Sequence, residues 1–170
     1  ELANGFGNLA SRVIAMVNRY FDGEIPVAVT YADADLQVQQ VAARAINGAE
    51  KAIDEVAIHE AISSVWLLVD ELNNYITVQE PWVLAKSDEN VERLATVLYT
   101  AAEGLRVLAV ALSPVVPKAT QKLWAALAED SLGALSQQSL SNAAVWGQLV
   151  AGSKVGELEA LFPRIETEEK

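Results

Sequence analysis

Three polar side chains share one flank of an amphipathic segment near the start of the chain. On a helix that turns by roughly 100° per residue, Asn8, Arg12 and Arg19 point about a quarter turn away from the apolar stripe. Residues 2–21 contain no acidic side chain. Asn8 and Arg12 are four positions apart, so their side chains are neighbours on one helix face. An amide that both donates and accepts, beside a planar guanidinium, can hydrogen-bond the edges of bases in single-stranded nucleic acid.

Trp82 is the second candidate for such chemistry. It follows Pro81, which is expected to end the preceding helix and to leave the indole on a turn outside regular structure. A base that stacks on an exposed aromatic ring there gains about 1 to 3 kcal/mol. The residues alone still favour a structural alternative, in which Asn8 and the arginines are solvated or bond to adjacent helices and Trp82 folds back onto the protein. Three other tryptophans are interpreted as structural, two on apolar stripes and one as an anchor of the tail: Trp66, Trp124 and Trp146.

No catalytic or metal site is expected. The chain has no cysteine and a single histidine, His59, which argues against disulfides, thiolate zinc sites, cysteine nucleophiles and histidine-rich metal clusters. Asp54, Glu55 and Glu60 lie close to His59 in sequence, but no recognisable motif places a nucleophile beside them. We interpret His59 as solvated. No glycine-rich phosphate loop is present.

Length and composition predict one domain with a well-buried core, and the protein is expected to be cytoplasmic. A chain of 170 residues can bury a sizeable core, and 52% of its residues are apolar. No apolar run approaches the roughly 18 residues of a membrane span, so no membrane partner is expected. The start lacks the pattern of a signal peptide. Because the sequence opens on Glu1 with helical periodicity already under way, we expect a fragment of a longer protein.

The net charge of −11 argues against nucleic-acid binding. The charge is unevenly distributed, however. The acidic residues concentrate in residues 50–92 and in the tail, whereas residues 93–128 contain only Glu103 against four cations, namely Arg93, Arg106, Lys118 and Lys122. The charge also supports a different interpretation, in which an acidic helical bundle docks a basic protein partner or has a regulatory role.

Hydrophobic periodicity predicts an all-α fold, an antiparallel bundle of about five helices. The expected helices cover residues 1–21, 33–56, 58–79, 87–112 and 114–128. We expect residues 1–128 to form the bundle and residues 129–170 to form an extended tail packed on it, with the last residues frayed. Because the connections are short, helices adjacent in sequence are expected to be antiparallel neighbours.

Local sequence features predict the ends of these helices. Gly23 suits the C-terminal cap of the first, and residues 27–32 are expected to be an irregular link. Either Asp33 or Asp35 can cap the second helix. Its expected apolar positions include Leu36, Val41, Ile46 and Ile53.

Four blocks of sequence, in order, resemble the C-terminal part of bacterial methionyl-tRNA synthetases, a family of class I aminoacyl-tRNA synthetases. The blocks span nearly the whole chain: "LANGFGNLASRVIAMVNRYFDG", "NNYITVQEPWVLAK", "LRVLAVALSPVVPKATQKLW" and "LFPRIE". The resemblance implies the α-helical anticodon-binding domain of that family, which recognises the CAU anticodon of methionine tRNA. In the family, the Asn and Arg of the "NLxSR" block and the Trp of the "PW" block contact the anticodon, and these positions match Asn8, Arg12 and Trp82.

The resemblance also implies supporting residues and partners. Asn74 and Tyr75, just before Trp82, are expected to support the site. Arg19 is a further supporting candidate because of its place on the flank of the first helix, independently of the resemblance. The partners would be the anticodon loop of methionine tRNA and the catalytic domain of the same parent chain, a methionine–tRNA ligase that uses ATP. No cofactor is expected in this chain, because the catalytic motifs of the family are absent from it. Gly5 departs from the family pattern, standing where an acidic residue is expected, and would loosen the first helical turn.

Overall fold

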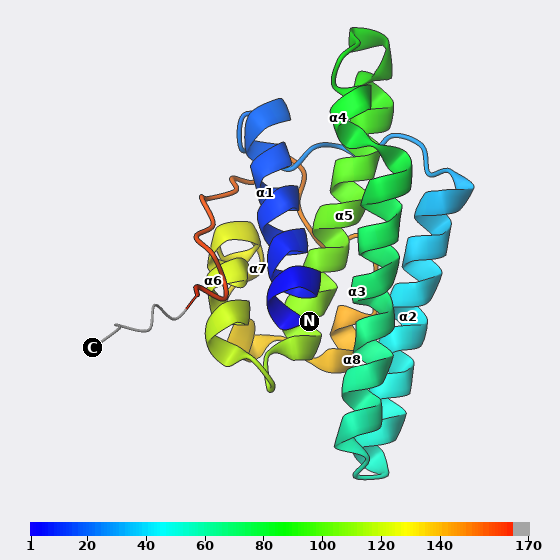
Figure 1. Ribbon diagram of the computed structural model, residues 1–170, viewed down its shortest axis with the longest axis vertical. Helices are drawn as coiled ribbons and strands as arrows, with labels where there is room; N and C mark the ends of the chain where they lie inside the picture. The colour runs from blue at the N-terminus through cyan, green and yellow to red at the C-terminus, as the bar shows by residue number, and fades with distance from the viewer. Residues whose placement is uncertain (165–170) are drawn as a thin grey trace.

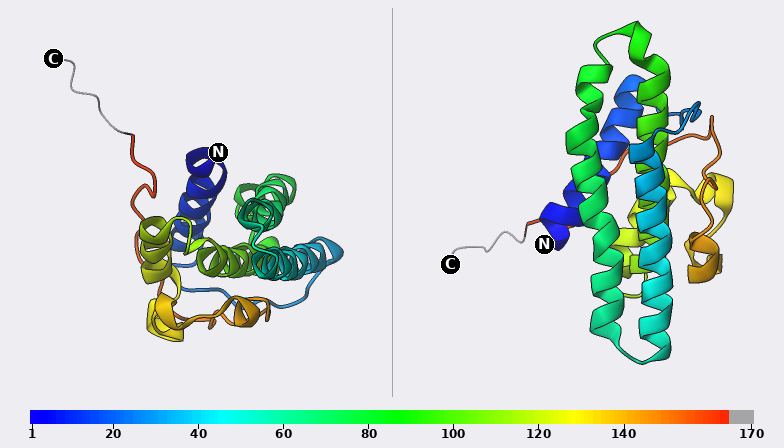
Figure 2. Two further views of the ribbon diagram at one scale, coloured as in Figure 1. Left: turned by 90° about the horizontal axis from the view of Figure 1, so that it is seen from below. Right: turned by 90° about the vertical axis from the view of Figure 1, so that its right-hand side faces the viewer.

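One long helix, α5 (Val91–Leu112), runs through the centre of the protein in the computed structural model, with the other helices packed around it (Figures 1 and 2). The structure describes residues 1–164. Every residue of α5 from 94 to 110 is buried. Together with the preceding turn, α5 is the one helix in the described residues that is long and apolar enough to cross a membrane, and its most apolar window is 94% buried inside the bundle. Its composition is therefore that of a core helix, apolar on all sides.

The other elements confirm the predicted all-α class. The described residues contain no strand, and Glu24 and Lys154 form an isolated bridge. The remaining long helices are α1 (Asn8–Tyr20), α2 (Asp33–Asp54), α3 (Ile58–Gln79) and α6 (Pro117–Leu127), with a wide π-helical turn, η1 (Leu2–Gly7), ahead of α1. The short helices are α4 (Pro81–Leu84), α7 (Glu129–Leu132), α8 (Leu140–Ala143), η2 (Asp88–Asn90) and η3 (Leu135–Gln137).

Several predicted local features differ from the structure. The helix α6 begins at Pro117, three residues after the predicted start, because its first turn tolerates the missing N–H of proline while residues 113–116 form a turn. Leu36 and Ile53 of α2 are exposed, whereas Val41 and Ile46 are buried as expected. The residues after 128 contain short helices in addition to extended segments. The predicted fraying concerns residues outside those that the structure describes.

The prediction that consecutive helices are neighbours holds for α2 and α3 but is wrong for α1 and α2. The helix α1 packs against α5 and α3. Residues 21–32 then carry the chain across the opposite side of α5 to the start of α2 (Figure 2). This link is fixed on α5 by a hydrogen bond from the Val29 N–H to Thr96 Oγ1 at 3.0 Å. Because α5 can bury apolar surface on every side, α1 does not need α2 as its partner.

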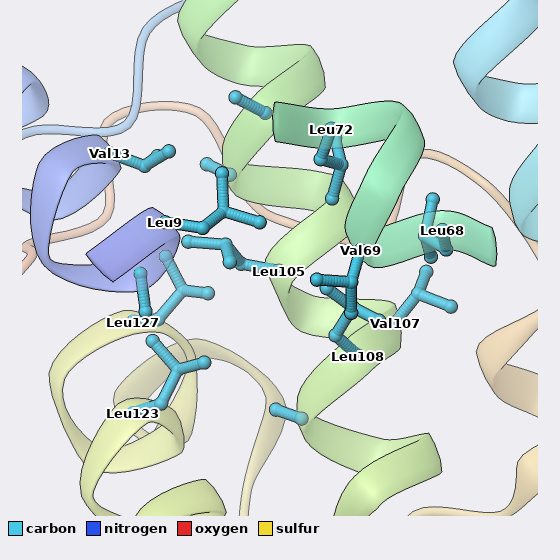
Figure 3. Packing of buried hydrophobic residues seen from close by; sticks show 14 of the residues in the cluster. Leu9, Val13, Leu68, Val69, Leu72, Leu105, Val107, Leu108, Leu123 and Leu127 are labelled. Atoms are coloured by element: carbon cyan, nitrogen blue, oxygen red, sulfur yellow. The ribbon is translucent and has the colours of Figure 1, made fainter. Parts of the chain in front are cut away.

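The core of the bundle consists of packed aliphatic side chains from four helices (Figure 3). Side chains from α1, α3, α5 and α6 meet there, among them Leu9, Val13, Val69, Leu72, Leu105, Leu108, Leu123 and Leu127. The close approach of α3 to α5 depends on Gly104, since a Cβ at this position would lie 2.7 Å from Leu72 Cδ1. Trp124, interpreted from the sequence as structural, is fully buried and donates its indole N–H to the Gly133 carbonyl at 2.8 Å.

A buried ion pair in α5 holds the segment after α8. Glu103 and Arg106 are both buried, and Arg106 Nε donates to Glu103 Oε1 at 2.9 Å. The same carboxylate accepts the backbone N–H groups of Gly147, Gln148 and Leu149 at 2.8 to 3.0 Å. Arg106 Nη2 donates to the carbonyls of residues 143 and 145. The two charges thus neutralise each other and also provide hydrogen-bond partners for the backbone of an irregular segment that lies against α5.

We expect Glu103→Leu to lower the free energy of unfolding by about 3 to 5 kcal/mol, because it leaves Arg106 buried without a counter-charge and three backbone N–H groups without an acceptor. Urea unfolding followed by circular dichroism measures this loss. The double variant Glu103→Leu/Arg106→Met is the matched control, since removal of both charges should recover part of the stability. A loss below about 1 kcal/mol for the single variant would contradict this account.

Candidate nucleic-acid interface

The start of helix α1 is shaped by two glycines at close contacts. A Cβ on Gly5 would lie 3.0 Å from Trp66 Cζ2, and a Cβ on Gly7 would lie 3.0 Å from Phe162 Cδ2. Phe162, near the end of the described chain, also packs edge-on against Phe6. The expectation that Gly5 loosens the first turn agrees with the wide π-helical turn there. The structure adds a reason for glycine, since a Cβ at position 5 would require the Trp66 ring to move.

Asn8 and Arg12 lie on the exposed flank of α1, as the sequence predicts. Both side chains are exposed, whereas the residues that directly follow them, Leu9 and Val13, are buried. The Arg12 guanidinium lies over the ring of Trp82, with its central carbon 5.8 Å from the ring centroid. This distance is typical of a cation–π contact. The structure therefore brings together Arg12 and Trp82, two residues far apart in sequence, with Asn8 one helical turn away.

The setting of Trp82 differs from the prediction. Trp82 lies on the single-turn helix α4, not on an irregular turn. Glu80, in the left-handed conformation with φ of 47°, ends α3, and Pro81 then occupies the first turn of α4, where its missing N–H is not needed. Trp82 is 37% exposed, so part of the indole packs on the protein and part is open to solvent. The one-turn helix α4 follows the end of α3 (Figure 1). It thus presents the Trp82 indole to the Arg12 guanidinium of α1.

The three supporting candidates occupy different places. Arg19 is exposed and lies over the ring of Tyr20, 5.7 Å from its centroid. Asn74 is exposed and lines a groove of about 450 Å³ between α2 and α3, with Arg44 on the opposite wall. Tyr75 is only 3% exposed, and its hydroxyl donates to Asp35 inside the protein. Tyr75 can therefore support the site only indirectly, by fixing the helices beneath it.

Asp35 is the centre of a polar cluster that joins three helices. Its carboxylate accepts the Ala32 N–H at 2.8 Å, the Tyr75 hydroxyl and the Arg93 guanidinium at 2.6 and 3.0 Å. Arg93 also donates to Gln79 Oε1 at 2.7 Å, at the last residue of α3. Of the two predicted caps of α2, only Asp35 accepts a hydrogen bond from a backbone N–H in the described structure, that of Ala32, and it does so from the first turn of the helix. The cluster fixes the end of α3 from which α4 and Trp82 follow.

The ionisation of the cluster follows from these contacts. Burial by itself raises the pKa of Asp35, but hydrogen bonds from Arg93, Tyr75 and the Ala32 backbone outweigh burial and leave this pKa below its ordinary value of 3.8. Burial and the neighbouring carboxylate raise the pKa of Tyr75, and the hydrogen bond to Asp35 raises that of Arg93. Asp35 is therefore a carboxylate and Arg93 a cation at neutral pH.

Two of the four cations in residues 93–128 are held in ion pairs, one of them buried and the other partly buried. Arg106 is buried against Glu103, and Arg93 is paired with Asp35. Lys118 and Lys122 are exposed on α6. The surface in this part of the chain is therefore less basic than the sequence suggested. Among residues 1–164, no three His, Asp or Glu side chains are grouped so that they could hold a metal ion.

Sequence analysis missed one polar contact between α3 and the start of α1. Asn73 Nδ2 donates to the Gly5 carbonyl at 3.1 Å and to the Val69 carbonyl at 3.0 Å. An asparagine within a long helix is unfavourable unless its side chain has such partners. The place of Asn73 inside a predicted helix could have indicated a side-chain hydrogen bond. Its partner, however, depends on the packing of η1 and α1 against α3, which the sequence does not show.

The comparisons with known proteins agree with the fold. Residues 25–170 match the family model described as the anticodon binding domain of methionyl tRNA ligase. The chain is 49% identical to the methionine–tRNA ligase of Streptomyces coelicolor, over 98% of this chain and 32% of that protein. It is 40% identical to the enzyme of Deinococcus radiodurans, over 98% of this chain and 24% of that protein.

A solved structure has the same arrangement. The apo form of Mycobacterium tuberculosis methionyl-tRNA synthetase aligns with a TM-score of 0.87 and 33% identity, over 98% of this chain and 33% of that one. The same enzyme bound by methionyl-adenylate aligns with a TM-score of 0.86. The chain thus spans about a third or less of the length of the relatives it matches.

We expect Asp35→Asn to lower the free energy of unfolding at pH 7 by about 3 kcal/mol, because it leaves Arg93 without its counter-charge. The pKa of Asp35 is lower in the folded than in the unfolded chain, so the carboxylate stabilises the fold fully above pH 3.8 and less as the pH falls through the folded value. The difference between wild type and variant should therefore narrow below about pH 4.

Urea unfolding between pH 3 and pH 7 measures this difference. Asp33→Asn, at an exposed position two residues away, is the control and should change stability little at any pH. A difference for Asp35→Asn that stays constant across this range would contradict the assignment.

Proposed function

The chain belongs to the family of methionyl-tRNA ligase anticodon-binding domains, and from that premise we propose that it binds the anticodon loop of methionine tRNA and reads its CAU bases. The observation that carries the proposal is the contact between Arg12 and Trp82, which joins two sequence candidates at one exposed place. Asn8 lies one turn away on the same flank of α1. Together these side chains offer a stacking face and hydrogen-bonding groups of both polarities.

Each side chain has a distinct part in this proposal. The Trp82 ring stacks on one unpaired base, and the guanidinium of Arg12, already beside that ring, donates to the edge or backbone of the same nucleotide. Asn8 offers a donor and an acceptor to a neighbouring base edge, which an arginine alone cannot do. Arg19, farther along α1, adds positive charge to the same flank. Asn74 and Tyr75 are retained as supporting residues, Tyr75 through the cluster that fixes the end of α3.

We propose in addition that the parent protein is a cytoplasmic methionine–tRNA ligase, whose catalytic domain binds ATP and attaches methionine to the tRNA. Relatives that are three to four times longer support this division of labour. The domain described here would then supply specificity at the anticodon, and the remainder of the parent would supply the chemistry.

The rival interpretation is an acidic bundle that docks a basic protein partner. Its expectation is opposite, since neutralising acids in residues 50–92 would abolish binding while changes at Asn8, Arg12 or Trp82 would not. The comparisons give no support to this interpretation. The rival interpretation also assigns no role to the contact between Arg12 and Trp82.

We expect a labelled CAU anticodon hairpin to bind more tightly than a hairpin with a changed first anticodon base. Trp82→Ala should weaken CAU binding by about tenfold or more, because a base loses its stacking partner. Fluorescence anisotropy measures both affinities. Val83→Ala, at an exposed position on the same short helix, is the matched control and should leave the preference intact. Equal binding of both hairpins by the wild-type chain would contradict the proposal.

We expect binding to depend weakly on salt, because Arg93 and Arg106 are internally paired and few cations remain on the site to meet phosphates. The logarithm of the association constant should fall against the logarithm of salt concentration with a slope of about −1 to −2, equivalent to about one to three phosphates. The same anisotropy titration at several KCl concentrations gives this slope. A slope steeper than about −4 would show a large phosphate footprint and contradict this account.

A further inference from the structure

Asn73 joins the two parts of the chain that carry the proposed base-reading side chains. Its amide donates to the Gly5 carbonyl in the turn that leads into Asn8 and Arg12. Its own helix, α3, leads directly into α4 and Trp82. Among the described residues, this is the only side-chain hydrogen bond between α3 and the segment made of η1 and α1.

The contact is made where the turn η1 packs against α3. Gly5 leaves no side chain between its backbone and the Trp66 indole, so α3 lies directly against the turn. Asn73 also donates to Val69, four residues earlier in α3, so both amide hydrogens have acceptors and its orientation is fixed. The Thr77 hydroxyl donates to the backbone carbonyl of Asn73 at 2.9 Å. The amide therefore acts as a fixed spacer between two backbones.

We propose that Asn73 is a positioning residue for base reading, which sets the separation between the α1 side chains and Trp82. The inference rests on the proposed function, because it concerns the same site. Stacking on Trp82 and hydrogen bonding to Asn8 must be made by nucleotides of one loop, so a shift of α1 along α3 weakens the correct base more than a wrong one. Asn73 itself is partly buried and needs no contact with RNA.

Asn73→Asp tests this role with a side chain of the same size. The carboxylate has no donor and faces two carbonyl oxygens, so the link to Gly5 is lost. Asn47→Asp, on the exposed face of α2, is the control for the added charge. Asn73→Ala removes the donors without adding charge and serves where the Asp variant fails to fold. Circular dichroism establishes that each variant is folded.

The informative quantity is the ratio of affinities for the CAU hairpin and the hairpin with a changed first base. A partly unfolded variant binds both hairpins less in equal proportion, so a merely structural role leaves this ratio unchanged. We expect the Asn73 variants to reduce the ratio by about fivefold to tenfold and Asn47→Asp to preserve it. In the Trp82→Ala background, Asn73→Asp should reduce the ratio no further, because the two residues act on one geometry.

The outcomes separate this inference from the proposed function. A wild-type chain that discriminates, with Asn73 variants that discriminate equally well, overturns the positioning role and leaves the proposed function standing. Losses that add fully in the double variant also overturn it, because they show that Asn73 acts independently of Trp82. A wild-type chain that binds both hairpins equally overturns both.

Discussion

The structure depends on the complete burial of helix α5. A helix that is apolar on all sides must be covered on all sides, and no single neighbour can do this. Helices α1, α2, α3 and α6 cover most of it, and the chain after α8 covers the rest. Glu103 and Arg106 make that last layer specific, because two buried charges remain acceptable only while their hydrogen bonds are made. The irregular segment at residues 143–149 supplies the partners, and the pair in turn satisfies its backbone.

The same constraint determines where a recognition surface can form. Because α5 separates α1 from α2, the exposed flank of α1 meets the far end of α3, and Arg12 reaches the short helix that follows it. That end of α3 is held from the interior by Asp35 and Arg93, which bond to the start of α2 and to Gln79. In the proposed function the Asp35 cluster does not contact RNA. It fixes the end of α3 that leads into α4 and Trp82.

Sequence reasoning was most successful where local chemistry decides the outcome. The bounds of α3 follow from its periodicity and from Pro81, and the exposed flank with Asn8 and Arg12 follows from the 3.6-residue repeat. It failed where tertiary packing decides. The position of α1 against α5 depends on the burial of α5 on every side, and the helical setting of Trp82 depends on a left-handed Glu80, which only packing stabilises. The pairing of Arg93 with Asp35 likewise joins residues far apart in sequence, whose proximity no local pattern reveals. Glu103 and Arg106 are three residues apart on one helix, but their burial and their backbone partners at residues 143–149 depend on tertiary packing.

The acidity of the chain is compatible with the proposed base-reading site because the flank of α1 carries no acid, although Trp82 itself lies within the acid-rich residues 50–92. Phosphate attraction is long-ranged and carries no sequence information, whereas hydrogen bonds and stacking act only at contact distance. The acid-free flank of α1 allows bases to reach Asn8 and Arg12 without meeting a carboxylate on that helix. Acidic surface elsewhere penalises every other mode of RNA binding, because a loop that approaches it gains no base contacts to offset phosphate repulsion. If the proposed function holds, a net charge of −11 favours one orientation of the bound loop over the alternatives, at the expense of affinity that does not distinguish sequences.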